Sequence, residues 1–356
     1  MLEARLRAAK NLLESIAADA ILVLGLTNIR YLTGFSGSDG ALLLSREGQW
    51  LLCDGRYTTQ ARQQATLCRI VEYKIKSEAI SRLILDRGWR RLAFDAEQTT
   101  VSVHGAIAAK LPGVEMVPLA GELDELRGVK SDAELTIIEQ SCSLASAALE
   151  QLLPMIRPGV SERTLALELE IAMKRSGAEE KAFDFIVASG DRGALPHGRP
   201  TDREIAAGEL VTIDFGARLH GYHSDETVTV AVVSADERQR EIYAVVKEAH
   251  DLAIAAVRPG AGCREIDAIA RDFIAGHGFG EYFGHGLGHG VGLDVHETPT
   301  LSPRSEQTLA EGMVITVEPG IYIPGWGGVR IEDTIAVTAD GCRLLTKVPK
   351  ELIFAG

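Results

Sequence analysis

The feature that most constrains this chain is an internal repeat in its C-terminal part. Three segments occur twice, in the same order: I-R-P-G at 156–159 and V-R-P-G at 257–260, A-G-E-L-V-T-I-D-F-G at 207–216 and E-G-M-V-I-T-V-E-P-G at 311–320, and H-S-D-E-T-V-T-V at 223–230 and R-I-E-D-T-I-A-V at 330–337. Helical patterns flank each R-P-G segment, and the later segments have strand character. We therefore expect an α+β domain with two similar halves, each helix–helix–strand–strand.

The repeat places carboxylates at matching positions in the two halves. Asp214 aligns with Glu318, and Asp225 aligns with Glu332. Strand alternation directs Asp214 to the face opposite the apolar Ile213, so the acids can converge if the halves face each other. Converging carboxylates are unfavourable unless they are protonated or bind cations. The alternative is a set of solvated acids at strand ends, which does not predict their symmetric placement.

A glycine-rich stretch at 284–299, G-H-G-L-G-H-G-V-G-L-D-V-H-E-T-P, adds His285, His289 and His296 to these acids. Glycine permits a close approach of backbone segments and disfavours a helix, so we expect a tight loop that enters a strand around Val291–Val295. Imidazole binds transition metals and titrates near neutral pH. A surface loop with incidental histidines is the alternative.

A set of four carboxylates and one imidazole has more oxygen ligands than a structural zinc site uses. The set suits two divalent ions, with Mn²⁺ or Co²⁺ favoured and Zn²⁺ or Fe²⁺ as alternatives. Two such ions can share a hydroxide and polarise a carbonyl group. His197 and His296, each in an H-x-x-P setting, are predicted to handle protons or substrate beside the ligands. His223 is left open between a functional and a surface position.

Residues 1–122 are predicted to form a separate α/β domain. Its expected strands are Ala20–Leu26, Ala41–Ser45, Gln49–Cys53, Leu92–Asp95 and Glu115–Leu119, and its expected helices are Thr58–Leu67, Glu78–Arg87 and Val101–Leu111. Residues 28–40 are interpreted as a turn-rich loop whose aromatic side chains plug the core. A polar stretch and a capping box of Ser131 and Glu134 mark the start of the second domain, at 123–356.

The composition excludes several classes of protein. A net charge of −13 argues against a nucleic-acid partner. No run of apolar residues is long enough to span a membrane, and the first residues indicate an amphipathic helix rather than a signal peptide. The five scattered cysteines lack C-x-x-C spacing, which favours reduced thiols and a cytoplasmic location.

Together these motifs resemble the pita-bread metallopeptidases of family M24. The residues that match the family's dinuclear metal site are Asp214, Asp225, His289, Glu318 and Glu332. V-E-P-G at 317–320 and R-I-E-D-T at 330–334 also stand where the family has them, and residues 1–122 resemble the creatinase/prolidase N-terminal domain. The resemblance covers the whole chain and is strongest to the proline-specific branch, Xaa-Pro aminopeptidase and Xaa-Pro dipeptidase (prolidase).

The resemblance implies a role for each metal ligand. Asp225 and Glu332 are expected to bridge the two ions. Asp214 is expected to chelate one ion, and His289 and Glu318 the other. Glu318 is also the expected proton acceptor for the attacking water.

Five further residues are expected around the substrate by the same resemblance. His197 and His296 are expected to steady the scissile carbonyl group and the tetrahedral intermediate. His285 resembles a substrate-side histidine of the aminopeptidase type. Arg330 is placed to meet a carboxylate of the substrate or of the site. Tyr322 is expected to line the site, with a packed core position as the alternative.

The implied activity is hydrolysis of Xaa-Pro bonds, at the N-terminus of peptides or in Xaa-Pro dipeptides. Proline lacks an N–H and restricts its neighbours, so a dedicated pocket is required. A methionine aminopeptidase shares the ligands but does not need residues 1–122, and a creatinase-like amidinohydrolase lacks the ligands. A non-catalytic peptide-binding module is the third alternative. The chain length of the substrate is left open, and a homodimer is expected by family analogy.

Overall fold

The computed structural model describes residues 2–356, and the chain divides into two compact units, Met1–Arg127 and Gly128–Gly356. The division lies after Arg127 rather than after residue 122. A short helix, α6 (Glu122–Glu125), and the residue that follows it remain bound to the first unit. The Tyr31 hydroxyl donates to the Leu126 carbonyl oxygen at 2.6 Å, and Asn28 Nδ2 donates to Asp124 Oδ1 of α6 at 3.0 Å, so these residues belong with the first unit.

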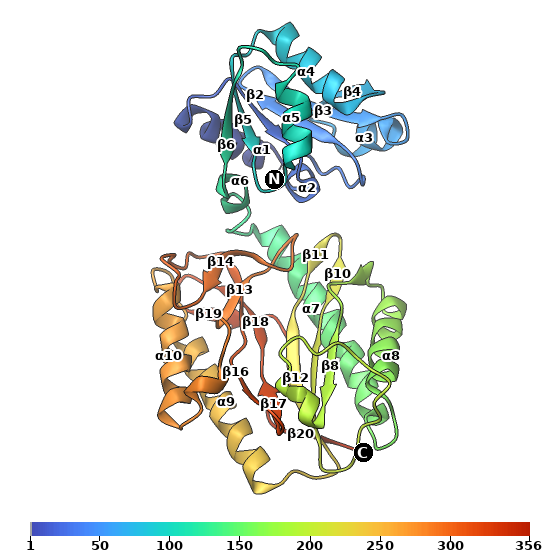
Figure 1. Ribbon diagram of the computed structural model, residues 1–356, viewed down its shortest axis with the longest axis vertical. Coiled ribbons are helices and arrows are strands. Elements are labelled where there is room, and N and C mark those ends of the chain that lie inside the picture. Colours follow the sequence, from blue (N-terminus) through green and yellow to red (C-terminus); the bar gives the residue numbers. More distant parts are fainter. Residues whose placement is uncertain (1) are drawn as a thin grey trace. The chain divides into compact units, whose positions relative to one another are not determined.

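The first unit is an α/β domain built on a six-stranded sheet with the order β4-β3-β2-β1-β5-β6 (Figure 1). Its strands are β1 (Ala20–Val23), β2 (Ala41–Ser45), β3 (Gly48–Asp54), β4 (Arg69–Tyr73), β5 (Arg91–Asp95) and β6 (Glu115–Leu119). Its other helices are α1 (Leu2–Ser15), α2 (Leu26–Thr33), α3 (Thr58–Gln64), α4 (Lys76–Arg87) and α5 (Val101–Ala108). Residues of α4 and α5 pack with alternate residues of the strands in one apolar core, and α1 and α2 contact β2.

The segment 28–40 begins as a helix, not as the loop that the sequence indicated. Helix α2 runs from Leu26 to Thr33 and buries Ile29 and Leu32. It ends where Gly34 adopts a left-handed conformation (φ 79°) and its N–H donates to the Arg30 carbonyl oxygen, as helix C-termini often do. The turn-forming residues that follow masked this short apolar pattern. The aromatic prediction is correct, because Phe35 is buried in the core.

The second unit repeats one order of elements, as predicted. Its first half contains α7 (Asp132–Leu152), η1 (Leu153–Met155), α8 (Glu162–Arg175), β7 (Glu180–Lys181), β8 (Ile186–Ser189), η2 (Gly190–Ala194), β9 (Leu210–Phe215), β10 (Ala217–Leu219), β11 (Tyr222–His223) and β12 (Glu226–Val232). The capping box of Ser131 and Glu134 at the start of α7 is confirmed. Strands β9 and β12 pair antiparallel within a sheet of order β20-β12-β9-β8.

The second half follows the same plan. It contains α9 (Glu237–Ala256), α10 (Cys263–Gly276), η3 (Gly280–Tyr282), β13 (Gly288–Gly290), β14 (Glu297–Leu301), β15 (Val314–Val317), β16 (Gly320–Ile323), β17 (Gly327–Arg330), β18 (Asp333–Val337), β19 (Cys342–Leu344) and β20 (Ile353–Ala355), the last of which joins the sheet of the first half. Strands β15 and β18 pair antiparallel, like β9 and β12, within a sheet of order β14-β13-β15-β18-β19.

Each half has its own apolar core. In the first, α7 and α8 pack against β8, β9 and β12. In the second, α9 and α10 pack against β15 to β18. Figure 1 shows the two helix pairs on opposite sides of the strands of this unit. The strand faces turned away from the helices are therefore left for polar residues. Among residues 2–356, no helix has both the length and the apolar character needed to cross a bilayer.

Candidate metal centre

The predicted ligands lie on the central strands of both halves or directly beside them. Asp214 is on β9, and its neighbours Ile213 and Phe215 are fully buried in the core of the first half, so the predicted alternation is correct. Asp225 immediately precedes β12. In the second half, His289 is on β13, Glu318 follows β15, and Glu332 lies between β17 and β18.

The glycines around His289 are required by the packing of the backbone. A Cβ atom at Gly288 would lie 2.1 Å from the Thr316 carbonyl oxygen, and one at Gly290 would lie 2.2 Å from that of Thr298. Only glycine permits such an approach. The strand therefore forms at Gly288–Gly290, where β13 fits between β14 and β15. The strand expected at Val291–Val295 is wrong, and those residues form a loop.

Three of the predicted ligands converge on one point. Asp225, His289 and Glu332 each offer a ligand atom, and these atoms lie within 4.8 Å of one another. His289 Nε2 lies 3.7 Å from Asp225 Oδ2 and 3.3 Å from Glu318 Oε1, which brings Glu318 into the same cluster. Asp214 joins it electrostatically, because its charge acts on the pKa values of Asp225 and Glu332.

The cluster carries more negative charge than its surroundings compensate. Burial, together with the charges of Glu332 and Asp214, raises the pKa of Asp225 well above its ordinary range. Burial, together with the charges of Glu318 and Asp214, has the same effect on the pKa of Glu332. Burial also raises the pKa of Glu318, but the hydrogen bond and charge of His289 outweigh it and leave that pKa lowered.

These residues fit divalent metal ions. Asp214 Oδ1 is buried and makes no hydrogen bond to any part of the chain that the structure describes, and a buried unpaired carboxylate oxygen is costly. Cations next to Asp225 and Glu332 would relieve the repulsion that raises their pKa values. Carboxylate oxygens together with one imidazole nitrogen are a donor set that suits divalent metal ions.

A chain of hydrogen bonds connects three predicted substrate-side residues to Asp214. Arg330 donates from Nη2 to Asp214 Oδ2 at 2.6 Å and from Nη1 to the Tyr322 hydroxyl at 3.0 Å. That hydroxyl lies 2.8 Å from His285 Nε2, and His285 Nδ1 lies 2.7 Å from the Gly286 carbonyl oxygen. Burial lowers the pKa of His285 and raises that of Tyr322 to about 12, so both are neutral near pH 7.

The remaining histidines lie at different depths. The His296 ring centroid is 4.2 Å from that of His289, and burial and the His289 charge lower the pKa of His296. His197 is exposed in the loop after η2, but its charge acts on His296, and Arg330 Nη1 donates to the carbonyl oxygen of the preceding Pro196 at 3.1 Å. His223 is buried rather than on the surface, with its Nδ1 3.2 Å from the Gly292 carbonyl oxygen.

Two threonines in the centre were missed by the sequence interpretation. The Thr227 hydroxyl donates to Glu332 Oε2 at 2.6 Å, and the Thr334 hydroxyl donates to the Asp225 carbonyl oxygen at 2.6 Å. Each threonine of one half therefore supports a ligand of the other. The signal was present in the repeat, because D-E-T at 225–227 aligns with E-D-T at 332–334.

Two family models match this chain. Metallopeptidase family M24 matches residues 136–339, which include every predicted ligand. The creatinase/prolidase N-terminal domain matches residues 5–129. The chain belongs to metallopeptidase family M24. It combines the N-terminal domain with the pita-bread C-terminal domain, as the sequence indicated, and it is a metallopeptidase.

Relatives with solved structures share the fold over nearly the whole chain. The Xaa-Pro dipeptidase from Bacillus anthracis has a TM-score of 0.97 at 40% identity and covers 99% of this chain and 100% of its own. The X-Pro aminopeptidase from Thermotoga maritima has a TM-score of 0.92 at 33% identity, covering 98% and 99%. The Xaa-Pro dipeptidase of Pyrococcus horikoshii is 39% identical over 94% of both chains.

Proposed function

We propose that this metallopeptidase hydrolyses the bond between an N-terminal residue and a following proline, in Xaa-Pro dipeptides or longer peptides. The observation that carries the proposal is the convergence of Asp225, His289 and Glu332, with Glu318 beside them. The names of its relatives, Xaa-Pro dipeptidase and X-Pro aminopeptidase, support proline specificity.

The metal ligands we propose are those of the sequence prediction: Asp214, Asp225, His289, Glu318 and Glu332. Asp225 and Glu332, whose pKa values are raised well above their ordinary range by burial and by neighbouring carboxylates, would hold the ions together with the other three ligands. When bound, a pair of divalent ions supplies Lewis acidity and a hydroxide nucleophile at neutral pH. We propose Mn²⁺ or Co²⁺ as the native ions, with Zn²⁺ or Fe²⁺ as alternatives.

The side chains divide the remaining work between proton transfer and charge stabilisation. Glu318, whose pKa is kept low by His289, accepts the proton of the attacking water and delivers it to the leaving proline nitrogen. His296, next to His289, donates a hydrogen bond to the oxygen that becomes negative in the transition state. His197, in the loop after η2, assists His296 in stabilising this negative charge.

The Arg330–Tyr322–His285 chain holds the substrate side of the centre in a fixed geometry. Arg330 neutralises part of the Asp214 charge and fixes the main chain before His197. Tyr322 and His285 are neutral, so the Tyr322 hydroxyl donates to His285 Nε2 and His285 Nδ1 donates to the Gly286 carbonyl oxygen, which fixes both rings without adding charge. Such a preorganised wall suits a rigid proline ring, whose tertiary amide gives an enzyme no N–H to bind.

We further propose a cytoplasmic homodimer. All five cysteines are free thiols, which supports a reducing compartment. The dimer rests on analogy with the family through the N-terminal domain. The net charge of −13 makes nucleic acid an unfavourable partner.

A substrate series with added Mn²⁺ tests the proposed function. The purified protein is assayed on Ala-Pro, Ala-Pro-Ala, Ala-Ala and Met-Ala-Ala. We expect cleavage of one or both proline substrates, and the ratio of their kcat/KM values distinguishes a dipeptidase from an aminopeptidase. Faster cleavage of Met-Ala-Ala would support the methionine aminopeptidase alternative instead. No cleavage of any peptide by metal-loaded protein would favour a binding module.

A further inference from the structure

Two buried acids lie directly behind the proposed ligands Asp225 and Glu332. Glu226 follows Asp225 and Asp333 follows Glu332 in the sequence. Because side chains alternate along a strand, each of these acids points to the face opposite its neighbour. Glu226 accepts a hydrogen bond from Ser146 of α7 at 2.6 Å, and Asp333 Oδ2 lies 3.2 Å from His250 Nε2 of α9. Where the two halves meet, two carboxylates therefore lie on each face of the strands: Asp225 and Glu332 on one face, and Glu226 and Asp333 on the other. This junction of the two halves is called the seam below.

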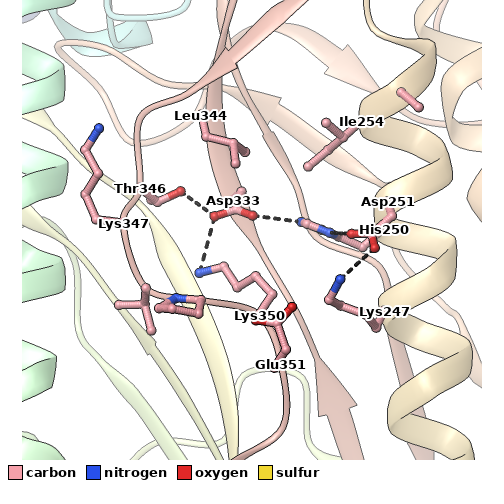
Figure 2. Close-up of a pocket in the computed structure, with 13 residues that line it drawn as sticks. Lys247, His250, Asp251, Ile254, Asp333, Leu344, Thr346, Lys347, Lys350 and Glu351 are labelled. Carbon is pink, nitrogen blue, oxygen red and sulfur yellow. Dashed lines mark hydrogen bonds and ion pairs between the residues drawn. The ribbon is translucent and has the colours of Figure 1, made fainter.

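Lys350 joins the two rear acids. Its Nζ lies 2.6 Å from Glu226 Oε1 and 3.3 Å from Asp333 Oδ1. All three side chains are almost fully buried, with exposed fractions of 6%, 1% and 5%. Lys350, Asp333, His250 and Thr346 are among the residues that line a pocket of about 430 Å³. Figure 2 shows Lys350 reaching Asp333, with His250 and Thr346 on the other sides of the same carboxylate.

We propose that Lys350 is a positioning residue that sets the separation of Asp225 and Glu332. Glu226 belongs to the first half and Asp333 to the second, so one ammonium group holds the two strands together directly behind the ligands. This inference rests on the proposed metal-binding role of Asp225 and Glu332. The Lys350 ammonium group, between Glu226 and Asp333, is called the clamp. It is not a metal ligand, but the positions of the proposed ligands depend on it.

The clamp acts through charge. If Lys350 lost its ammonium group, Glu226 and Asp333 would face each other in a buried site with one cationic partner fewer. Removing one partner of a buried ion pair leaves an uncompensated charge and is strongly unfavourable. The two strands can reduce this repulsion by separating. Each acid follows a proposed ligand by one residue, so such a movement is transmitted to Asp225 and Glu332.

The test measures Co²⁺ binding to metal-free protein, by calorimetry and by the visible absorption of the bound ion. Loss of residues that orient metal ligands typically weakens metal binding by about 10–100-fold. We expect Lys350→Met to weaken Co²⁺ binding by about this factor and to change the absorption spectrum, which reports the ligand geometry. Lys350→Arg keeps the charge and is expected to recover most of the affinity.

Lys347→Met is the matched control. Lys347 is three positions earlier, lines the same pocket and forms an ion pair with Glu139 at 3.2 Å, but it contacts neither rear acid through its side chain. We expect wild-type Co²⁺ affinity and spectrum for this variant. If Lys350→Met gave no folded protein, Glu226→Gln would replace it, because this change removes one arm of the clamp with little change of shape.

The outcomes separate this inference from the proposed function. Wild-type affinity and spectrum in Lys350→Met, or in its replacement Glu226→Gln, would overturn the clamp. An Arg variant as weak as the Met variant would overturn it too, because charge would then not explain the loss. Asp225→Asn, measured in the same series, should lose Co²⁺. If Asp225→Asn bound Co²⁺ like the wild type, the proposed metal centre itself would be wrong.

Discussion

The two halves of the C-terminal unit share one frame and differ in what they add to it. Each supplies two carboxylates from an antiparallel strand pair, β9 with β12 and β15 with β18. In the first half, Asp214 accepts a hydrogen bond at 2.6 Å from Arg330, which the second half supplies from β17. In the second, its counterpart Glu318 lies 3.3 Å from His289. One acid is held by a permanent cation and the other by a group that titrates.

This difference shows how a duplicated fold acquires an asymmetric centre. The strand repeat creates a nearly symmetric set of oxygens, which is suited to a pair of ions. The strand that pairs with β9 in the first half, β8, has the sequence I-V-A-S, whereas the strand that pairs with β15 in the second half, β13, is G-H-G and brings an imidazole beside Glu318. Glu318, beside a histidine that can gain or lose a proton, is therefore suited to proton transfer. Asp214, beside the permanently charged Arg330, is suited to keep its negative charge.

The largest expected effect tests the histidines that only the second half brings into the cluster. His289→Ala removes a proposed ligand, so we expect metal content and turnover to fall together. His296→Ala should keep its metal while kcat falls by about two to four powers of ten, through the loss of acid–base or electrostatic help. Metal analysis of the purified variants, followed by steady-state kinetics on Ala-Pro, distinguishes the two roles.

A reversed result would exchange these assignments. Loss of metal in His296→Ala with normal metal in His289→Ala would place the ligand at His296. His277→Ala, which changes a histidine of the same half that bonds the Phe273 carbonyl oxygen on α10, serves as the control and should match the wild type in both measurements.

The next effect concerns the dependence of stability on pH. The pKa values of Asp225 and Glu332 are raised in the folded, metal-free protein, chiefly by burial. The contribution of these two groups to the stability of this form is therefore fully present below the ordinary carboxyl pKa and is lost as the pH rises through the raised values. His289, whose pKa is also raised because Glu318 outweighs burial, acts in the same direction.

Metal ions should reverse this loss, because they favour the ionised ligands. We expect the gain in Tm on adding Mn²⁺ to chelated protein to grow by a few degrees between about pH 7 and pH 9. Differential scanning calorimetry with and without Mn²⁺ measures it. A gain that is independent of pH, or a Tm that chelation leaves unchanged, would contradict a charged ligand cluster that is unstable without its cations.

The sequence predicted the parts of this molecule that rest on local pattern. The repeat located Asp214, Asp225, Glu318 and Glu332, because a duplicated strand keeps its spacing and alternation. The repeat did not locate Lys350. This residue lies outside the repeated segments, and only the folded chain brings it between Glu226 and Asp333. The strand at Gly288–Gly290 was displaced in the prediction, since glycine has low strand propensity and its close backbone contacts are visible only in the packed structure.

The smallest expected effect compares the two threonines that cross between the halves. Thr227→Val removes the hydrogen bond to Glu332 Oε2, and Thr334→Val removes the one to the Asp225 carbonyl oxygen, with little change in shape. A ligand oxygen that loses its donor is reoriented directly, whereas a main-chain oxygen is also held by its strand. We therefore expect Thr227→Val to weaken Co²⁺ binding by about tenfold and Thr334→Val by less. Calorimetric titration of both variants with Co²⁺ measures the difference. Equal losses of Co²⁺ affinity would contradict this expectation and would mean that the two threonines support the two ligands equally.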